Sequence, residues 1–317
     1  MQLPLEIRQA IEGLVQNYKP TDLRTAAGEV SARYRDQGGR DVRIQSAAEA
    51  AAYLVARFPA TFAAAIAALK NVKDVPASVL DIGAGPGTVA LAALTLWPEM
   101  RDVTLVEPNK YLREAGKALF AELGLNAHWV EGDVRSVKDL PLADLVVAGY
   151  VMNEVVRGDA KIEAVADSLW SAAKQTLVLI EPGTTLGYQV LMNFREHLLK
   201  AGAQMMAPCP HAAACPLIGK SWCHFSVRVE RSKLHKLVKE GADLGYEDEK
   251  FSYLAVSRAA VALPKARIIG YPTGTKVVLV PACLASGTAE TLQISKSHPG
   301  FKAARKAEWG DSFDYEL

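Results

Sequence analysis

The chain begins with a helical pattern of hydrophobic positions. One apolar stripe at a period of about 3.6 residues contains Leu5, Ile7, Ile11, Leu14 and Val15. Ser46, followed three residues later by Glu49, makes a capping box ahead of an alanine-rich run. Pro59 should divide that run, because its ring and missing N–H break an interior helical turn. We therefore expect an N-terminal helical region over residues 1–75.

From residue 78 the sequence pattern changes to short runs rich in β-branched residues that alternate with amphipathic stretches. The strand-like runs are SVLDIG, VTLVEP, AHWVEG, DLVVAG and TLVLIEP. The helical stretches include 88–97, 110–123 and 161–174. Apolar strands separated by helices specify right-handed βαβ crossovers and a parallel sheet buried on both faces. The pattern predicts a doubly wound, Rossmann-like α/β core.

The later segments predict additions to this core. Residues 250–258 have the pattern of a further strand, which we place at the sheet edge. Short β-type segments follow Pro264, ahead of a basic helical tail. The expected organisation is a helical region (1–75), an α/β core (76–202), a cysteine-rich loop (203–225), the rest of the core sheet (226–260) and a C-terminal extension (261–317).

Composition narrows the class of protein. The 317 residues are 50% apolar and 22% charged, with 36 Lys and Arg against 35 Asp and Glu, which excludes disordered and collagen-like chains. No uninterrupted apolar run reaches the ~18 residues of a membrane helix. Glu6 and Glu12 lie early in a segment without a secretory apolar region or an Arg-rich transit character. From this we expect a cytoplasmic monomer with no membrane partner.

A glycine-rich loop follows the first predicted strand. It reads Asp81-Ile82-Gly83-Ala84-Gly85-Pro86-Gly87-Thr88. Glycines suit a sharp turn whose backbone approaches a ligand more closely than a Cβ would allow. The absence of Gly-Lys-Ser/Thr excludes a phosphate-binding Walker loop. Thr88 stands where a dinucleotide fingerprint has its third glycine, which disfavours NAD binding without removing it.

Acidic residues end the next two predicted strands. Glu107 is placed to accept both hydroxyls of a ribose, and Asp133 to meet an adenine amino group. This ordered set resembles the class I S-adenosylmethionine-dependent methyltransferases. The resemblance implies that S-adenosylmethionine is the cofactor and that its contacts are Asp81, Gly83, Ala84, Gly85, Gly87, Glu107, Asp133 and Tyr150.

In that family the residues after the fourth strand, here 149–154, face the methyl group. The Asn/Asp-Pro-Pro-aromatic signature of amino-group methylases is missing, and no cysteine lies nearby. Asn153 and Glu154 are the candidate substrate-facing groups, although Asn153 suits a helix cap equally well. Positioning alone can supply much of the rate of an in-line displacement, so we assign no general base.

All four cysteines lie beyond residue 200. They are Cys209, Cys215, Cys223 and Cys283, a C-x5-C-x7-C-x59-C spacing unlike the pairs of zinc ribbons. Four thiolates suit either a tetrahedral Zn²⁺ or a 4Fe–4S iron–sulfur cluster. His211 and His224 offer substitute nitrogen ligands. The clustering predicts a metal or cluster site in a reducing compartment.

The combination resembles the methyltransferase-like family of small-ribosomal-subunit assembly factors, which has mitochondrial and bacterial members. The motifs that carry the resemblance are Ser31 to Arg35, Tyr53 to Pro59, the glycine loop, the cysteine segment with its CPH, CP and WCHF steps, and Ala304 to Asp311. The resemblance implies that the four cysteines bind a 4Fe–4S cluster and that the protein engages small-subunit ribosomal RNA. We prefer iron–sulfur to zinc on this ground.

Two basic stretches border the cysteines in sequence. Residues 228–240 carry five basic residues against two acids, and 296–306 carry four against none, near Phe301 and Trp309. We predict RNA contacts from Arg228, Arg231, Lys233, Lys296, Lys302, Arg305 and Lys306, brought into one surface by the cluster. The leading hypothesis is a methyltransferase of small-subunit ribosomal RNA. Its rival is an assembly factor that binds the cofactor and catalyses nothing.

Overall fold

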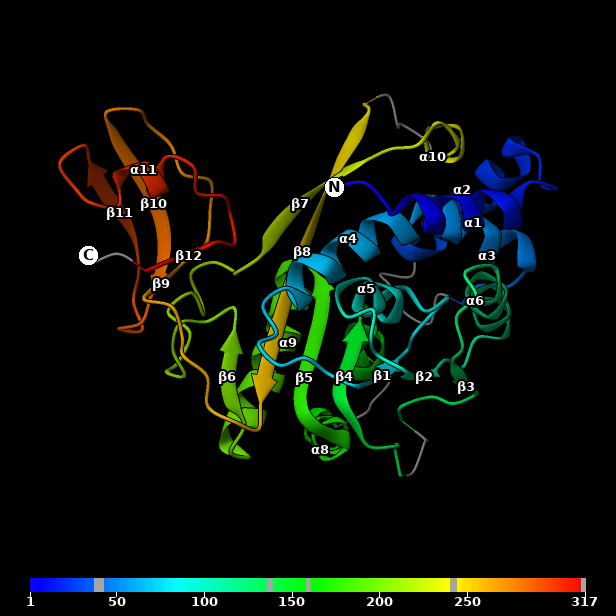
Figure 1. Cartoon of the computed structure of the whole chain (residues 1–317), viewed down its shortest axis with the longest axis horizontal. Coiled ribbons are helices and arrows are strands. Elements are labelled where there is room, and N and C mark those ends of the chain that lie inside the picture. Colours follow the sequence, from blue (N-terminus) through cyan, green and yellow to red (C-terminus); the bar gives the residue numbers. More distant parts are fainter. Residues whose placement is uncertain (37–42, 136–138, 158–160, 240–243, 315–317) are drawn as a thin grey trace.

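An eight-stranded mixed sheet runs through the middle of the molecule (Figure 1). The computed structural model describes residues 1–36, 43–135, 139–157, 161–239 and 244–314. The strand order is β3-β2-β1-β4-β5-β8-β6, and β7 also pairs with β8. The bounds are β1 Ser78–Ile82, β2 Asp102–Val106, β3 His128–Val130, β4 Ala143–Gly149, β5 Ala173–Pro182, β6 Gln204–Ala207, β7 Phe225–Glu230 and β8 Tyr246–Ser257.

Strands β1 to β5 are parallel, and the order of the chain reverses at β1, which lies between β2 and β4. Parallel strands need both faces covered, and all five residues of β1 are buried. The register pairs Ile82 with Val106 and with Ala148, so these three strands end at one edge. The predicted doubly wound, Rossmann-like α/β fold of the class I methyltransferases is confirmed by this topology.

The prediction of an edge strand over 250–258 is wrong. β8 runs antiparallel to β5 on one side and to β6 and β7 on the other. Its last seven residues are all buried, which requires neighbours on both sides as well as both faces. The continuous apolar run of the sequence fits this interior place better than an edge.

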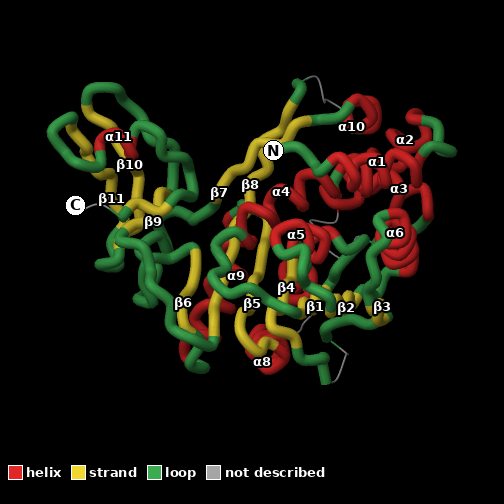
Figure 2. The backbone as a smooth tube through the Cα atoms, viewed as in Figure 1, coloured by secondary structure: helices red, strands yellow, loops and turns green. Residues whose placement is uncertain are grey.

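Helices cover both faces of the sheet (Figure 2). The N-terminal helices are α1 Leu5–Val15, α2 Pro20–Asp36, α3 Ala47–Ala56 and α4 Phe58–Leu69. The helices of the core are α5 Thr88–Leu96, α6 Lys110–Glu122, α7 Met152–Arg157, α8 Ile162–Ala172, α9 Thr185–Lys200 and α10 Lys233–Val238. The side chains of α4 and α5 pack with one face of β1, β4 and β5, whereas those of α8 and α9 pack with the other.

The N-terminal helices follow the sequence signals closely. The hydroxyl of Ser46 accepts from the backbone N–H of Glu49 at 3.2 Å, which confirms the capping box at α3. Pro59 lies in the first turn of α4, where its missing N–H costs nothing. Helix α4 is apolar on all sides, and a helix of that kind is buried. It lies against β5, β7 and β8, so it is part of the core rather than an appendage.

No single helix among the described residues is long and apolar enough to cross a membrane. Helices α3 and α4 pass that test only as a pair, with a bend of 52° between them. Most of their side chains are buried inside the protein.

A second, antiparallel sheet forms the C-terminal extension, at the left of Figure 1. Its order is β11-β10-β9-β12. The elements are β9 Ala266–Ile268, β10 Val277–Leu284, β11 Ala289–Ser295, α11 Phe301–Ala304 and β12 Ser312–Phe313. It has an apolar core of its own. Only the single turn α11 of the predicted basic helical tail is helical. Gly300 and Gly310 stand on either side of a segment too short for a longer helix.

Candidate cofactor site and cysteine cavity

The glycine loop lies at the carboxyl edge of the sheet, where the order of the strands reverses. Gly83, Gly85 and Gly87 have φ angles of 63°, 57° and 82°, in the left-handed region that favours glycine. A Cβ on Gly87 would lie 2.5 Å from the Phe120 ring, so that position also lacks room for a side chain. Ligands of open α/β sheets bind at this kind of crevice. The loop is therefore built for close approach of a ligand to backbone.

Glu107 ties the glycine loop to the end of β2. Its two carboxylate oxygens accept from the backbone N–H groups of Gly85 and Asn109, both at 2.7 Å. The side chain is 5% exposed, and burial raises its pKa, while the two N–H donors oppose that rise. The carboxylate thus binds the backbone of the glycine loop directly. The predicted contact of Glu107 with a ribose stays a prediction.

Asp81 has a structural role that the sequence did not predict. One carboxylate oxygen accepts from the backbone N–H of Ala90 at 2.9 Å, in the first turn of α5. The other has no partner in the described part of the chain. Burial, with a further contribution from Glu107, raises its pKa to about 8. Asp81 therefore links the end of β1 to the first turn of α5, and its predicted contact with the cofactor stays a prediction.

Asp133 follows β3 and keeps its charge. Its carboxylate pairs with Arg135, whose guanidinium lowers the pKa of the acid. The side chain is partly exposed at the same edge of the sheet as Glu107. Arg135 sets the orientation of this carboxylate at that edge.

Tyr150 lies after β4 in a strained conformation, with a φ of 62° that side-chain-bearing residues rarely adopt. Its hydroxyl donates to Glu249 at 2.9 Å, and the Arg57 guanidinium lies 4.9 Å from its ring centroid. Arg57 also forms a two-pronged ion pair with Glu249, at 2.8 and 3.1 Å. Strain of this kind gathers at functional sites.

The contact between Arg57 and Glu249 was not predicted from the sequence. The available signal was Arg57 itself, a cation that interrupts the apolar run of α3 and α4. Its partner stands 192 residues away on β8, and nothing in the sequence links them. The triad of Arg57, Tyr150 and Glu249 brings α3, β4 and β8 together at the carboxyl edge of the sheet.

The two candidate substrate-facing residues lie on α7. Asn153 is the second residue of that helix and not its cap, and its side-chain oxygen is buried without a hydrogen-bond partner among the described residues. The N-terminus of α7 is instead held by Glu181, which accepts from the backbone N–H of Met152 at 2.7 Å. Burial raises the pKa of Glu181 to about 8. Glu154, in the same first turn, contributes to that rise.

The four cysteines come together, as the sequence predicted. They are free thiols that line one cavity between α9, the loop 208–224 and β10. Tyr188 donates to the sulfur of Cys215 at 3.2 Å, and Nε2 of His211 lies 3.4 Å from the sulfur of Cys283. Burial and the neighbouring thiols raise the pKa of Cys283 to about 12 and that of Cys223 well above its usual value.

Among the described residues, no three His, Cys, Asp or Glu side chains are placed to hold a single metal ion. The donor chemistry nevertheless fits a thiolate-bound group, because four cysteines share one cavity. Two buried cations stand beside it, since Arg195 lies close to Cys209 and Arg267 lines the cavity. Such cations offset the negative charge of a thiolate-ligated centre. His224 points elsewhere and stacks on Trp222.

The predicted RNA contacts do not form one surface. Arg231 is nearly buried in an ion pair with Glu247, and Arg228 pairs with Asp248 while covering the Tyr246 ring. Lys233 is exposed on α10, beside the N-terminal helices. Lys296, Lys302, Arg305 and Lys306 are exposed on the C-terminal extension, at the opposite end of the molecule (Figure 1). The expectation of a single basic face is wrong, because β7 carries the first stretch away from the second.

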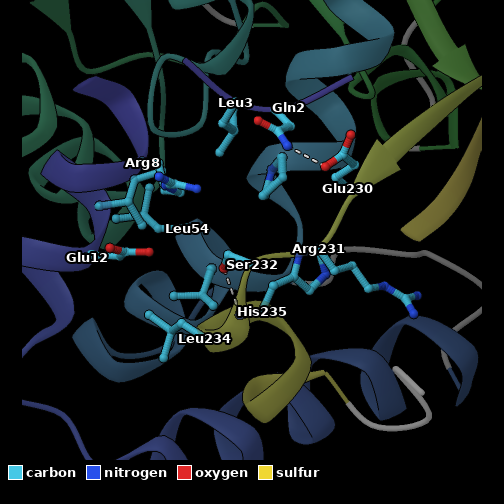
Figure 3. Close-up of a pocket in the computed structure, with 13 residues that line it drawn as sticks. Gln2, Leu3, Arg8, Glu12, Leu54, Glu230, Arg231, Ser232, Leu234 and His235 are labelled. Carbon is cyan, nitrogen blue, oxygen red and sulfur yellow. Dashed lines mark hydrogen bonds between the residues drawn. The ribbon is translucent and has the colours of Figure 1, made fainter. Parts of the chain in front are cut away.

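A further cavity lies between the N-terminal segment and the turn from β7 to α10 (Figure 3). Apolar Leu3, Leu54 and Leu234 share its wall with Arg8 and Glu12. His235, beneath it, is 1% exposed, and burial lowers its pKa to about 4. No sequence pattern predicted this cavity, which is separate from the glycine loop.

Comparisons with known proteins agree with the predicted resemblance. A family described as mitochondrial small ribosomal subunit Rsm22 matches residues 47–314. The human mitochondrial ribosome assembly protein METTL17 is 26% identical over 294 residues, covering 82% of this chain and 61% of that protein. The Schizosaccharomyces pombe Rsm22-cox11 tandem protein 2, also mitochondrial, is 26% identical over 212 residues, covering 59% of this chain and 28% of that protein.

The chain thus spans less than two thirds of the length of either relative. Among solved structures, the magnesium protoporphyrin IX methyltransferase of Synechocystis with bound S-adenosylmethionine matches with a TM-score of 0.41 and 12% identity, over 76% of this chain and 97% of that one. The strand order β3-β2-β1-β4-β5-β8-β6 identifies the fold independently of this likeness.

The comparisons correct one expectation. The cytoplasmic location inferred from the N-terminus is contradicted, because the family and both relatives are described as mitochondrial. The match over residues 47–314 exceeds half of the chain by a wide margin. The chain therefore belongs to the Rsm22 family, a methyltransferase-like family of small-ribosomal-subunit assembly, as its motifs predicted.

Proposed function

We propose that the protein binds S-adenosylmethionine at the glycine loop and transfers its methyl group to small-subunit ribosomal RNA during assembly of the subunit. The observation that carries the proposal is the contact of Glu107 with the Gly85 N–H at the reversal point of the sheet. It combines an acid, a left-handed glycine and the edge at which nucleosides bind in this fold.

Each residue of the site has a role in this proposal. Glu107 would hold the ribose hydroxyls, Asp133 would contact the adenine, and the glycines would let the backbone approach the cofactor. The cofactor supplies an electrophilic methyl group, and the protein aligns an acceptor with it. Tyr150 and Asn153 border the acceptor side, where Arg57 and Glu249 fix the orientation of the tyrosine. Alignment of this kind contributes to the rate without a general base.

Calorimetry tests the cofactor site. Purified protein should bind S-adenosylmethionine and S-adenosylhomocysteine with one site per chain. Gly85→Asp should abolish binding, because the new side chain is strained at a φ of 57° and places a carboxylate beside Glu107. Gly28→Asp on α2, remote from the loop, is the matched control. Absence of heat from the wild-type protein would refute the cofactor part of the proposal.

We also propose that Cys209, Cys215, Cys223 and Cys283 hold a 4Fe–4S cluster, with Zn²⁺ as the alternative occupant. The shared cavity and the two nearby arginines support a thiolate-bound centre. It would tie the loop 208–224 to β10 and so shape the surface between the core and the C-terminal extension. Anaerobic purification followed by absorption spectroscopy and elemental analysis decides between iron–sulfur and zinc. A colourless protein with one zinc and no iron would refute the 4Fe–4S cluster.

A second candidate function is that of an assembly factor that binds the cofactor without turnover. The described residues after β4 include no His, Lys or Cys beside Tyr150 to act as a base, and the human relative is named as an assembly protein. Incorporation of labelled methyl groups into immature small subunits separates the two. Incorporation that is lost in Gly85→Asp would rule out the non-catalytic function.

A further inference from the structure

Four aromatic rings form a continuous row beside the cysteine loop. Trp222 stacks on His224, with ring centroids 5.3 Å apart and 17° between the planes. Trp309 meets His224 edge to face at 4.7 Å, and Tyr271 meets Trp309 in the same manner at 4.9 Å. We call these four residues the aromatic row. It joins the cysteine loop to two separate segments of the C-terminal extension.

The ends of the aromatic row are open to solvent. Tyr271 is 59% exposed and Trp222 is 37% exposed, while the two inner rings are half-buried. A row that served only to pack the extension against the core would bury its ends as well. Two large rings presented at the surface indicate a site at which another flat group stacks.

The row begins at the edge of the sheet where the cofactor site lies. The indole N–H of Trp222 donates to the carbonyl of Gly183 at 3.0 Å, and Gly183 directly follows β5. The N–H of Gly183 donates to the carbonyl of Lys250 at 2.9 Å. Lys250 follows Glu249, the acceptor of the Tyr150 hydroxyl. Two hydrogen bonds and one step along β8 therefore connect Trp222 with the acceptor side of the proposed reaction.

Exposed cations flank the row. Lys250 lies beside Gly183 and makes no ion pair with other described residues. Lys220 precedes Trp222 by two residues, and Arg305 and Lys306 precede Trp309 on the segment that runs from α11 toward β7 (Figure 1). Aromatic faces between cations match the alternation of bases and phosphates in a single strand. A duplex, whose bases are already stacked on one another, lacks the free faces that the row would contact.

We propose that the aromatic row is a stacking site for unpaired bases of single-stranded RNA, which it holds next to the acceptor side of the cofactor site. The inference rests on the proposed engagement of RNA and names the part of the RNA that is recognised. The row holds bases by their faces, and therefore with little sequence preference. The flanking cations bind the phosphates.

Fluorescence anisotropy with a labelled, unstructured RNA oligonucleotide and a hairpin of the same composition tests the proposal on the full chain. Tyr271→Ala should weaken binding of the single strand at least about 5-fold, the lower end of what one base stack contributes. Tyr271→Phe should bind within about 2-fold of the wild type, since it keeps the ring. Tyr111→Ala, which removes a 38% exposed tyrosine on α6, is the matched control and should bind as the wild type does.

Two outcomes would overturn the inference. The first is wild-type affinity of Tyr271→Ala for the oligonucleotide; if that variant also associated more weakly with purified small subunits, the row would be a protein contact. The second is an equal loss of hairpin binding, which would indicate backbone charge alone. Metal content and cofactor calorimetry on the same variants separate the two proposals. If Tyr271→Ala binds RNA as the wild type does while the protein binds the cofactor, the stacking proposal fails and the proposed function stands. If the protein does not bind the cofactor, the effect of Tyr271→Ala on RNA binding still tests the stacking proposal.

Discussion

Two buried acids at the sheet edge accept hydrogen bonds from the first turns of two helices. Asp81 accepts from the start of α5 and Glu181 from the start of α7, and burial raises the pKa of each to about 8. Both helices flank the glycine loop. The protonation of these two carboxyls is therefore linked to the integrity of the site.

Asp81→Asn should change how stability depends on pH. The pKa of Asp81 is about 8 in the folded chain against 3.8 in the unfolded chain, so folding takes up a proton between those values. The folded state is then favoured most at the acidic end of this range, and stability is lost as pH rises toward 8. The asparagine mimics the protonated acid, so between pH 5 and pH 8 the variant should lose less free energy of unfolding than the wild type.

Urea unfolding at several pH values measures this difference, which is limited to about 1.4 kcal/mol per pH unit. Asp102→Asn, which changes an exposed carboxyl at the start of β2, should follow the wild-type curve. Parallel curves for Asp81→Asn and the wild type would show that the acid is ionised in both states.

For single residues, the sequence predicts those contacts whose two partners lie close together along the chain or at the ends of neighbouring strands. Glu107 was identified because it follows a strand next to the glycine loop, and the structure places it on the Gly85 N–H. Glu249 was missed, because its contacts with Arg57 and Tyr150 depend on how β8 pairs with β5. A pairing over such a separation leaves no local pattern.

Among the elements, α6 supports the glycine loop from behind. Gly116 lies where α6 contacts both the loop and β3: an added Cβ would stand 2.3 Å from the Trp129 ring and 3.0 Å from the backbone of Pro86. The absence of a side chain there lets α6 approach the turn of the loop. The helix therefore sets the position of the loop through one residue.

Gly116→Ala should destabilise the protein by about 1–3 kcal/mol, because the crowded core must shift to admit the methyl group. It should also weaken cofactor binding, since Pro86 belongs to the loop. Gly28→Ala in the interior of α2 has no atom within 4 Å of the new Cβ, so it should stabilise by about 0.5–1 kcal/mol through helix propensity. Urea denaturation of both variants should give shifts of opposite sign; shifts of the same sign would contradict this account of Gly116.

Element type was predictable wherever the hydrophobic period was clear. The capped helix at Ser46, the break before Pro59 and the parallel strands all follow from spacing. The position of β8 inside the sheet was not predictable, because an apolar run indicates that a strand is buried but not which strands lie beside it. Short elements such as α11 depend on packing against β10 and β11 more than on their own sequence.

For the whole molecule, the junction between the core and the C-terminal extension depends on one buried cation. Arg267 on β9 donates to the carbonyls of Pro208 and Gly310, at 2.9 and 2.8 Å, and to the side-chain oxygen of Asn71 at 3.2 Å. It thereby links the cysteine loop, the C-terminal segment and the end of the N-terminal helices. The spacing of the four cysteines predicted a link between these parts, but nothing in the sequence pointed to Arg267, whose neighbours are distant along the chain.

Removing this cation should loosen the extension from the core. Arg267→Ala leaves three oxygens without a donor in a site that is 6% exposed to solvent, so the free energy of unfolding should fall by at least about 3 kcal/mol. Arg267→Lys should recover only part of it, because one ammonium cannot reach three acceptors in the planar pattern of a guanidinium. Arg305→Ala, which alters an exposed arginine of the same extension, should stay within about 0.5 kcal/mol of the wild type.

Limited proteolysis distinguishes loosening from general instability. The connection over residues 258–265 should become the first site of cleavage in Arg267→Ala, and the released core should keep its affinity for S-adenosylhomocysteine, because the glycine loop lies on the far side of β5 from this junction. Metal content should fall in parallel, since Cys283 leaves with the extension. A variant that loses stability uniformly, with cofactor binding and metal lost together and no preferred cleavage site, would show that the extension and the core fold as one unit.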